Sequence, residues 1–206
     1  MSVSIISELC GQWGGAIDKA KRMIDESAES GADAVKVQIY DTYQMPGDNR
    51  SKWEYLSMSQ EVFLELKEYS EKLGVDYFAS AFHQDRFDWI LNSGLKVNKI
   101  ASMLIESDFD LCIKMLESGL KTYCSLGKWN KEHLPFKNFN NVEILWASTR
   151  EPYNYIQAKK LGCKIITAPP SIIEKIENFK NISDKNLSIS TVKGFLKDSK
   201  LSKFKI

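Results

Sequence analysis

The chain alternates short apolar runs with longer amphipathic stretches over most of its length. The run 34–40 is nearly continuously apolar, which is typical of a strand in a parallel sheet that is buried on both faces. The stretch 16–30 instead places apolar residues on one stripe, as an amphipathic helix does. Gly31 and Gly74 follow helical stretches of this kind, and glycine commonly ends a helix because it accepts left-handed backbone.

This reading divides the chain into strands and helices that alternate. The strands are predicted over 3–9, 34–40, 77–82, 97–102, 121–126, 142–148 and 164–168. The helices are predicted over 16–30, 60–73, 86–92, 109–117, 153–161, 171–178 and 190–197. Such alternation predicts a parallel sheet with right-handed crossovers, either a closed barrel or an open doubly wound sheet.

The closed barrel is favoured because no G-x-G-x-x-G or P-loop motif follows any predicted strand, as a nucleotide-binding open sheet would require. We therefore predict an α/β fold, a (β/α)₈ TIM-type barrel, in a single domain over 1–206. At this length the barrel is short. Its eighth strand is either hidden, within 127–141 or near the C-terminus, or absent, which would leave the barrel incomplete.

Charge and cysteine usage exclude several classes of partner. The 28 basic and 27 acidic residues give a net charge of +1, so no overall field favours nucleic acid or an anionic membrane. The four cysteines form no C-x-x-C pair, which predicts reduced thiols rather than a zinc site. The sequence shows no leader peptide and no apolar run of membrane-spanning length, and we expect a cytoplasmic protein.

Polar residues interrupt the predicted strands close to their carboxyl ends, where a barrel builds its active site. A lysine within a strand, such as Lys99, must reach water from an edge strand, pair with a carboxylate or take part in chemistry, since an unpaired buried ammonium is costly. Two lysines, a guanidinium and several hydroxyls at one barrel mouth predict an anionic substrate. The residues concerned are Glu8, Lys36, Gln38, Ser80, Lys99, Ser102, Ser125, Ser148 and Arg150.

Five of these segments, in the same order and at similar spacing, resemble the first five strands of sialic acid (N-acetylneuraminate) synthases. They are SELC at 7–10, GADAVKVQ at 31–38, DYFASAF at 76–82, KIAS at 99–102 and SLG at 125–127. Those enzymes are (β/α)₈ barrels that condense phosphoenolpyruvate with an N-acetylated hexosamine, using a divalent metal. The resemblance implies a set of residues around the phosphate and carboxylate of phosphoenolpyruvate: Lys36, Ser80, Lys99, Ser102, Ser125 and Gly127. It places Glu8 and Gln38 near the reacting end.

The chain departs from that family at its metal ligands. Where the family has Asn-His-Asn-Gly after the first strand, this chain has GQWG at 11–14, and the family's later histidine pair has no counterpart. His83 and His133 are its two histidines, and neither stands at the position of that pair. We therefore expect no metal and no other cofactor.

A weaker resemblance covers about residues 144–198. The segments ASTREP at 147–152 and TAPPSII at 167–173 are similar to the last strands of transaldolases and fructose 6-phosphate aldolases. In that family a lysine on the fourth strand forms a Schiff base with a ketose, and Lys99 lies on the fourth predicted strand. Lys36 in the same barrel would lower the pKa of Lys99, and Glu8 would serve as acid or base.

These observations predict a sialic acid synthase-like enzyme of carbon-carbon bond chemistry, acting on a small phosphorylated or carboxylated, sugar-derived substrate. In this reading Lys99 and Glu8 are catalytic, and Arg150 joins the binding residues. Two alternatives stay open. One is a metal-free Schiff-base aldolase or transaldolase with Lys99 as nucleophile. The other is a non-catalytic barrel used for binding or assembly, and self-association would cover an open seam in so short a barrel.

Overall fold

The computed structural model describes residues 3–44, 54–125, 127 and 139–179, with the helical positions 186, 189, 192–194 and 196. Within this part of the chain, parallel strands form a closed barrel in sequence order. The strands are β1 (Ser4–Glu8), β2 (Ala34–Ile39), β3 (Asp76–Ala81), β4 (Val97–Ile100), β5 (Lys121–Ser125), β6 (Val142–Trp146) and β7 (Ile165–Ala168). Because β7 pairs directly with β1, from Ser4↔Ile165 to Ser7↔Ala168, the ring closes without an eighth strand.

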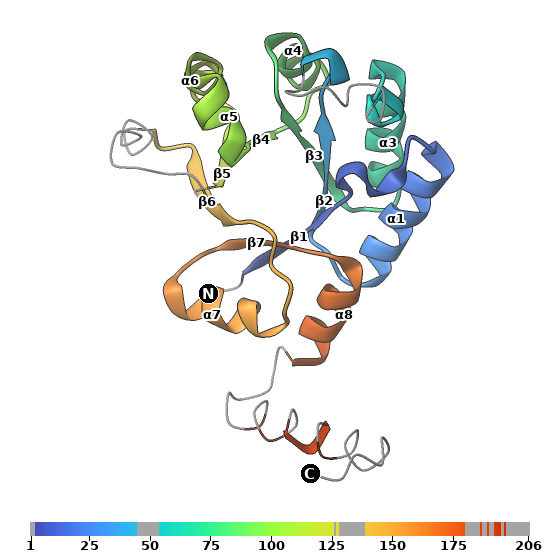
Figure 1. Ribbon diagram of the computed structural model, residues 1–206, viewed down its shortest axis with the longest axis vertical. Coiled ribbons are helices and arrows are strands. Elements are labelled where there is room, and N and C mark those ends of the chain that lie inside the picture. The colour runs from blue at the N-terminus through green and yellow to red at the C-terminus, as the bar shows by residue number, and fades with distance from the viewer. Residues whose placement is uncertain are drawn as a thin grey trace.

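Helices surround this barrel on its outer side (Figure 1). They are α1 (Ile17–Glu29), α3 (Gln60–Lys72), α4 (Gln84–Asn92), α5 (Ser102–Ser107), α6 (Phe109–Glu117), α7 (Tyr153–Leu161) and α8 (Pro170–Phe179). Short 3₁₀ helices, η1 (Cys10–Trp13), η2 (Thr42–Gln44) and η3 (Glu54–Leu56), lie in the connections after β1 and β2. Among the described residues, no helix is both long and apolar enough to cross a membrane.

The TIM-type α/β barrel predicted from the sequence is confirmed, in the incomplete form that the strand count left open. Two predicted strands end early. The strand 97–102 stops at Ile100, and Ser102 begins helix α5 instead. The strand 142–148 stops at Trp146, because Ser148 has left-handed backbone with φ +61°. Most of 127–141 and of the predicted helix 190–197 lies outside the described residues, and the single-domain assignment stays a prediction.

Apolar side chains fill both the lower interior of the barrel and the layer between strands and helices. Inside, Phe78 and Tyr123 meet edge to face with ring centroids 5.3 Å apart. Outside, a larger core includes Phe63 and Leu66 of α3, both fully buried. Burying a side chain of this size contributes about 2 to 3 kcal/mol. The upper part of the interior, toward the carboxyl ends of the strands, is polar.

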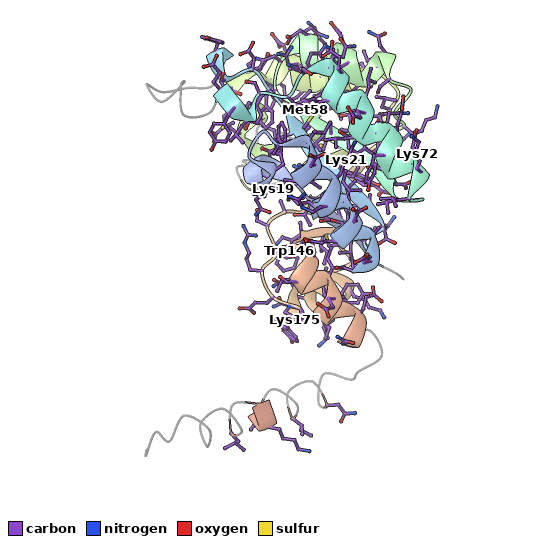
Figure 2. All side chains as sticks on the ribbon, turned by 90° about the vertical axis from the view of Figure 1, so that its right-hand side faces the viewer. Lys19, Lys21, Met58, Lys72, Trp146 and Lys175 are labelled. Carbon is purple, nitrogen blue, oxygen red and sulfur yellow. The ribbon has the colours of Figure 1, made fainter. Side chains whose placement is uncertain are left out.

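Most of the lysines that the structure describes lie on the outer surface of helices. Figure 2 shows Lys19 and Lys21 on α1 and Lys175 on α8 at the outside of the molecule. Two lysines differ, because Lys36 is fully buried and Lys99 is 5% exposed, and both belong to barrel strands. The polar upper interior that contains them is the candidate site.

Candidate functional site

A pocket of about 290 Å³ opens at the carboxyl ends of the strands. Every strand except β3 supplies residues to it, from its last two positions or from the segment that follows. Its lining is Glu8, Cys10, Gln12, Gln38, Lys99, Ala101, Ser102, Ser125, Ala147, Ser148, Arg150, Thr167, Ala168 and Pro169. This is the face on which TIM barrels carry their active sites.

Lys36 and Glu8 form an ion pair at the base of the pocket. The register of β1 and β2 places them side by side, and the Lys36 ammonium contacts Glu8 Oε2. Lys36 also donates to Ser80 Oγ at 3.3 Å. The ammonium is completely buried, whereas 26% of the Glu8 side chain is exposed. Glu8 therefore compensates a buried charge and also presents a carboxylate to the pocket.

Lys99 stands beside this pair without a partner of its own. Its side chain lines the pocket, and no described residue forms a hydrogen bond or ion pair with its ammonium. Burial, and to a smaller extent the nearby Lys36 charge, lower its pKa from 10.5 to about 7, against an opposing effect of Glu8. Near neutral pH, Lys99 is thus divided between an ammonium and a free amine.

Two serine hydroxyls line the same pocket as Lys99. Ser125 ends β5, and its buried Oγ has no hydrogen-bond partner among the described residues. Ser102 lies at the start of α5, and a side-chain carbon placed on Gly127 would lie 3.6 Å from Ser102 Oγ. An unsatisfied buried hydroxyl costs about 1 to 3 kcal/mol, so Ser125 Oγ is suited to a polar ligand or water in the pocket.

The wall formed by the end of β6 carries Ser148 and Arg150, both exposed. The amide of Ser148 donates to Thr167 Oγ1 at 2.9 Å, which connects this wall to β7. Left-handed backbone at a non-glycine residue costs about 1 to 3 kcal/mol, and such strain is concentrated at functional sites. The Arg150 guanidinium forms no ion pair with any described residue and lines the pocket.

A second strained residue, Cys10 with φ +41°, follows β1. Its amide donates to Glu8 Oε1 at 3.2 Å, and its thiol donates to Gln38 Oε1 at 3.4 Å. These contacts hold the Glu8 carboxylate and the Gln38 amide in place in the pocket. Glu8 is therefore fixed from both sides, by Lys36 and by the Cys10 backbone.

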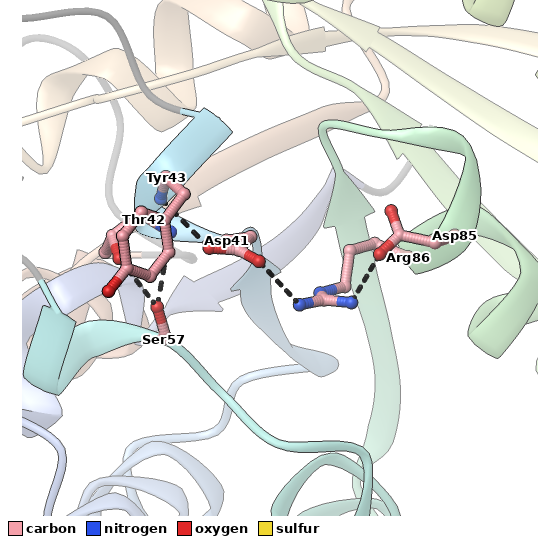
Figure 3. Close-up of polar contacts among 6 residues, drawn as sticks. All are labelled: Asp41, Thr42, Tyr43, Ser57, Asp85 and Arg86. Atoms are coloured by element: carbon pink, nitrogen blue, oxygen red, sulfur yellow. Dashed lines mark hydrogen bonds and ion pairs between the residues drawn. The ribbon is translucent and has the colours of Figure 1, made fainter.

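A separate polar cluster lies after β2 and β3 and does not line the pocket. Figure 3 shows the Arg86 guanidinium between Asp41, at 3.6 Å, and Asp85, at 2.6 Å. The guanidinium also stacks over the Trp89 ring at 4.1 Å. Arg86 therefore ties the loop after β2 to α4. His83, which precedes α4, is part of this region, and burial lowers its pKa.

Metal-ligating side chains do not gather in the part of the chain that the structure describes. No group of three or more histidine, cysteine, aspartate or glutamate residues is arranged there to hold a metal ion. At the pocket, Glu8 is paired with Lys36, and the Cys10 thiol is directed to Gln38. This donor set does not fit the divalent ion of the synthases that the sequence resembles. His133 lies outside the described residues, and metal-free function stays a prediction.

The predicted site residues come together, although their roles remain predictions. Seven of the ten line the pocket directly: Glu8, Gln38, Lys99, Ser102, Ser125, Ser148 and Arg150. Lys36 lies beneath it, with Ser80 in contact, and Gly127 lies against Ser102. Sequence reasoning missed Cys10, Gln12 and Thr167 as lining residues. Thr167 lies in the predicted strand 164–168, which ends just before a proline pair, and this position was the available signal.

Comparison with known proteins identifies a family and two curated relatives. The profile of the NeuB family matches residues 23–145, more than half of the chain. An N,N'-diacetyllegionaminic acid synthase of Legionella pneumophila is 30% identical over 119 residues, 50% of this chain and 33% of that protein. An uncharacterized protein of Methanocaldococcus jannaschii is 34% identical over 126 residues, 60% of this chain and 37% of that protein. The chain thus matches about a third of the length of these curated relatives.

Solved structures share the fold. An N-acetylneuraminic acid (sialic acid) synthetase from Leptospira borgpetersenii, in complex with citrate, superposes with a TM-score of 0.72 at 24% identity. That match covers 85% of this chain and 81% of the other. A truncated 3-deoxy-D-arabino-heptulosonate 7-phosphate synthase from Thermotoga maritima gives a TM-score of 0.61 at 10% identity, covering 86% of each chain. At such identities the likeness concerns the barrel fold alone.

Proposed function

Because the chain belongs to the NeuB family, we propose that its barrel binds a small phosphoenolpyruvate-type anion and serves sialic acid synthase-like carbon-carbon bond chemistry on a sugar-derived substrate. The observation that carries the proposal is the convergence of Lys99, Ser125 and Arg150 on one pocket, each without a described side-chain partner. Cations and hydroxyl donors that lack internal partners are suited to phosphate and carboxylate oxygens.

The size and charge of the pocket support a small ligand. A volume of about 290 Å³ lies at the lower limit of ligand sites, which suits an anion of a few carbon atoms better than a complete sugar. Lys99 and Arg150 would hold the anionic groups, and Ser102 and Ser125 would donate hydroxyl hydrogen bonds. Glu8, held by Lys36, is in place to accept or return a proton at the reacting end.

Binding measurements test this proposal directly. Isothermal titration calorimetry with phosphoenolpyruvate should give saturable binding to the wild-type protein. Lys99→Met should lose roughly 1.5 to 3 kcal/mol of charge-assisted hydrogen bonding, and Lys99→Arg should keep part of it. Lys19→Met, on the outer face of α1, is the matched control and should bind as the wild type does. Wild-type protein that binds neither phosphoenolpyruvate nor other small phosphates and carboxylates would refute the anion site.

A second candidate, a Schiff-base aldolase or transaldolase, is favoured by one specific observation. Lys99 is buried and unpaired among the described residues, and its pKa of about 7 leaves a free amine at neutral pH. That amine would attack a ketone or aldehyde carbon to form a carbinolamine, which loses water to give an imine. Glu8 would accept and return the protons.

Two readouts distinguish the candidates. Borohydride reduction in the presence of dihydroxyacetone, fructose 6-phosphate or pyruvate, followed by peptide mass analysis, should label Lys99 if the second candidate is correct. Lys36 is the internal control, because its amine is fully buried in the ion pair with Glu8 and does not line the pocket. Imine formation should rise through pH 7 as Lys99 loses its proton, whereas anion binding should fall. Anion binding without adduct formation would exclude the aldolase, and anion binding without turnover of any hexosamine would support the non-catalytic alternative.

A further inference from the structure

The backbone pairing of β6 with β7 ends before the residues of these two segments that line the pocket. The two strands pair at Leu145↔Ile165 and at Trp146↔Ile166. Beyond this point, hydrogen bonds of Thr167 connect the two segments. Its Oγ1 accepts from the Ser148 amide at 2.9 Å. Its carbonyl accepts from the Thr149 amide at 3.1 Å and from Thr149 Oγ1 at 2.8 Å.

These contacts lie at Ser148, whose backbone is left-handed, a conformation that residues other than glycine rarely adopt. Thr149 and Thr167 are 3% and 4% exposed, so water does not readily replace their mutual hydrogen bonds. The residues on either side of Thr149, Ser148 and Arg150, instead lie at the pocket surface. One buried threonine contact thus holds a strained segment whose neighbouring side chains face the candidate ligand.

We propose that Thr167 is a positioning residue that holds the Ser148 turn and thereby places Ser148 and Arg150 to grip the ligand opposite Lys99. The inference rests on the proposed anion site and extends it to a second wall. A guanidinium with a hydroxyl two residues away suits a phosphate or carboxylate that carries a neighbouring hydroxyl group.

Threonine variants separate positioning from general stability. Thr167→Val keeps the shape and the carbonyl but removes the Oγ1 acceptor, whereas Thr167→Ser restores an acceptor. Phosphoenolpyruvate binding should weaken roughly threefold to tenfold in the valine variant and stay within about twofold of wild type in the serine variant. Thr122→Val is the matched control, since buried Thr122 makes the equivalent side-chain contact with Asn98, away from the pocket. It should lower thermal stability without changing affinity.

A double-mutant cycle and hydrogen exchange complete the test. In an Arg150→Ala background, Thr167→Val should weaken binding little further, because the effect acts through Arg150. The Ser148 amide should exchange faster in the valine variant than in the serine variant, with or without ligand. Unchanged exchange would show that Thr167 does not hold the turn, and faster exchange with unchanged affinity would show that the ligand does not use this wall. Wild-type protein that fails to bind would instead refute the anion site, while the exchange comparison still judges the turn.

Discussion

Replacing Lys99 with methionine should stabilise the protein, although Lys99 lies at the centre of the candidate site. The reason is that the fold holds this amine where its charged form is disfavoured, with a pKa of about 7 against an ordinary 10.5. At about 1.4 kcal/mol for each tenfold change in proton affinity, this pKa difference limits the gain in free energy of unfolding to about 5 kcal/mol. Local relaxation and water in the pocket reduce the cost of burying the charge, and we expect Lys99→Met to be more stable than wild type by about 2 to 4 kcal/mol at pH 6.

The sign of the pH dependence follows from proton linkage. Below pH 7 the folded and unfolded chains both carry a protonated Lys99, and the full cost of burying the charge applies. Between about pH 7 and 10.5 the unfolded chain binds more protons than the folded one, so the free energy of unfolding rises with pH. The advantage of Lys99→Met over wild type should therefore be largest at pH 6 and fall to less than half by pH 9.

Urea denaturation at several pH values measures this difference. Lys19→Met, which removes an exposed lysine from α1, is the control and should show a small difference that does not change with pH. A Lys99→Met protein that is less stable than wild type at pH 6 would contradict the reasoning. So would a difference that stays constant from pH 6 to 9, because the stabilisation must follow the titration of the amine.

Three further substitutions test the ion pair, the core and the outer cluster. Glu8→Gln should cost about 2 to 4 kcal/mol in denaturant unfolding, because it leaves the buried Lys36 ammonium without a carboxylate. Phe63→Ala should lower the free energy of unfolding by about 3 to 5 kcal/mol, since a fully buried ring is removed from the layer between α3 and the barrel. Arg86→Lys should lose the stacking on Trp89, at about 1 kcal/mol by thermal unfolding, with unchanged phosphoenolpyruvate binding by calorimetry.

Much of the fold could be read from local patterns. The apolar run at β2 and the amphipathic stripe at α1 each carry their signal within a few residues, and both elements form close to their predicted bounds. Strand parity also works at short range. It places Lys36 and Gln38 on the same face of β2, and the structure directs both toward the polar end of the barrel.

Contacts between distant segments could not be predicted from local sequence patterns. The early ends of β4 and β6 depend on α5 and on the left-handed turn at Ser148, and neither has a strong local signature. Closure with seven strands depends on β7 meeting β1, two segments at opposite ends of the described barrel. Short-range periodicity carries no information about which strand lies beside which.

The sequence by itself determined the strand-helix alternation, the buried faces and the polar residues that end the strands. The tertiary structure decided which of those residues form ion pairs and hydrogen bonds with one another. Register alone brings Glu8 to Lys36, and Lys99 is then the buried lysine without a partner among the described residues. The lowered pKa of Lys99 and the hydrogen bond from the Ser148 amide to Thr167 likewise depend on contacts between segments far apart in the chain. Charge interactions and hydrogen bonds act over distances in space, and only the closed barrel sets those distances.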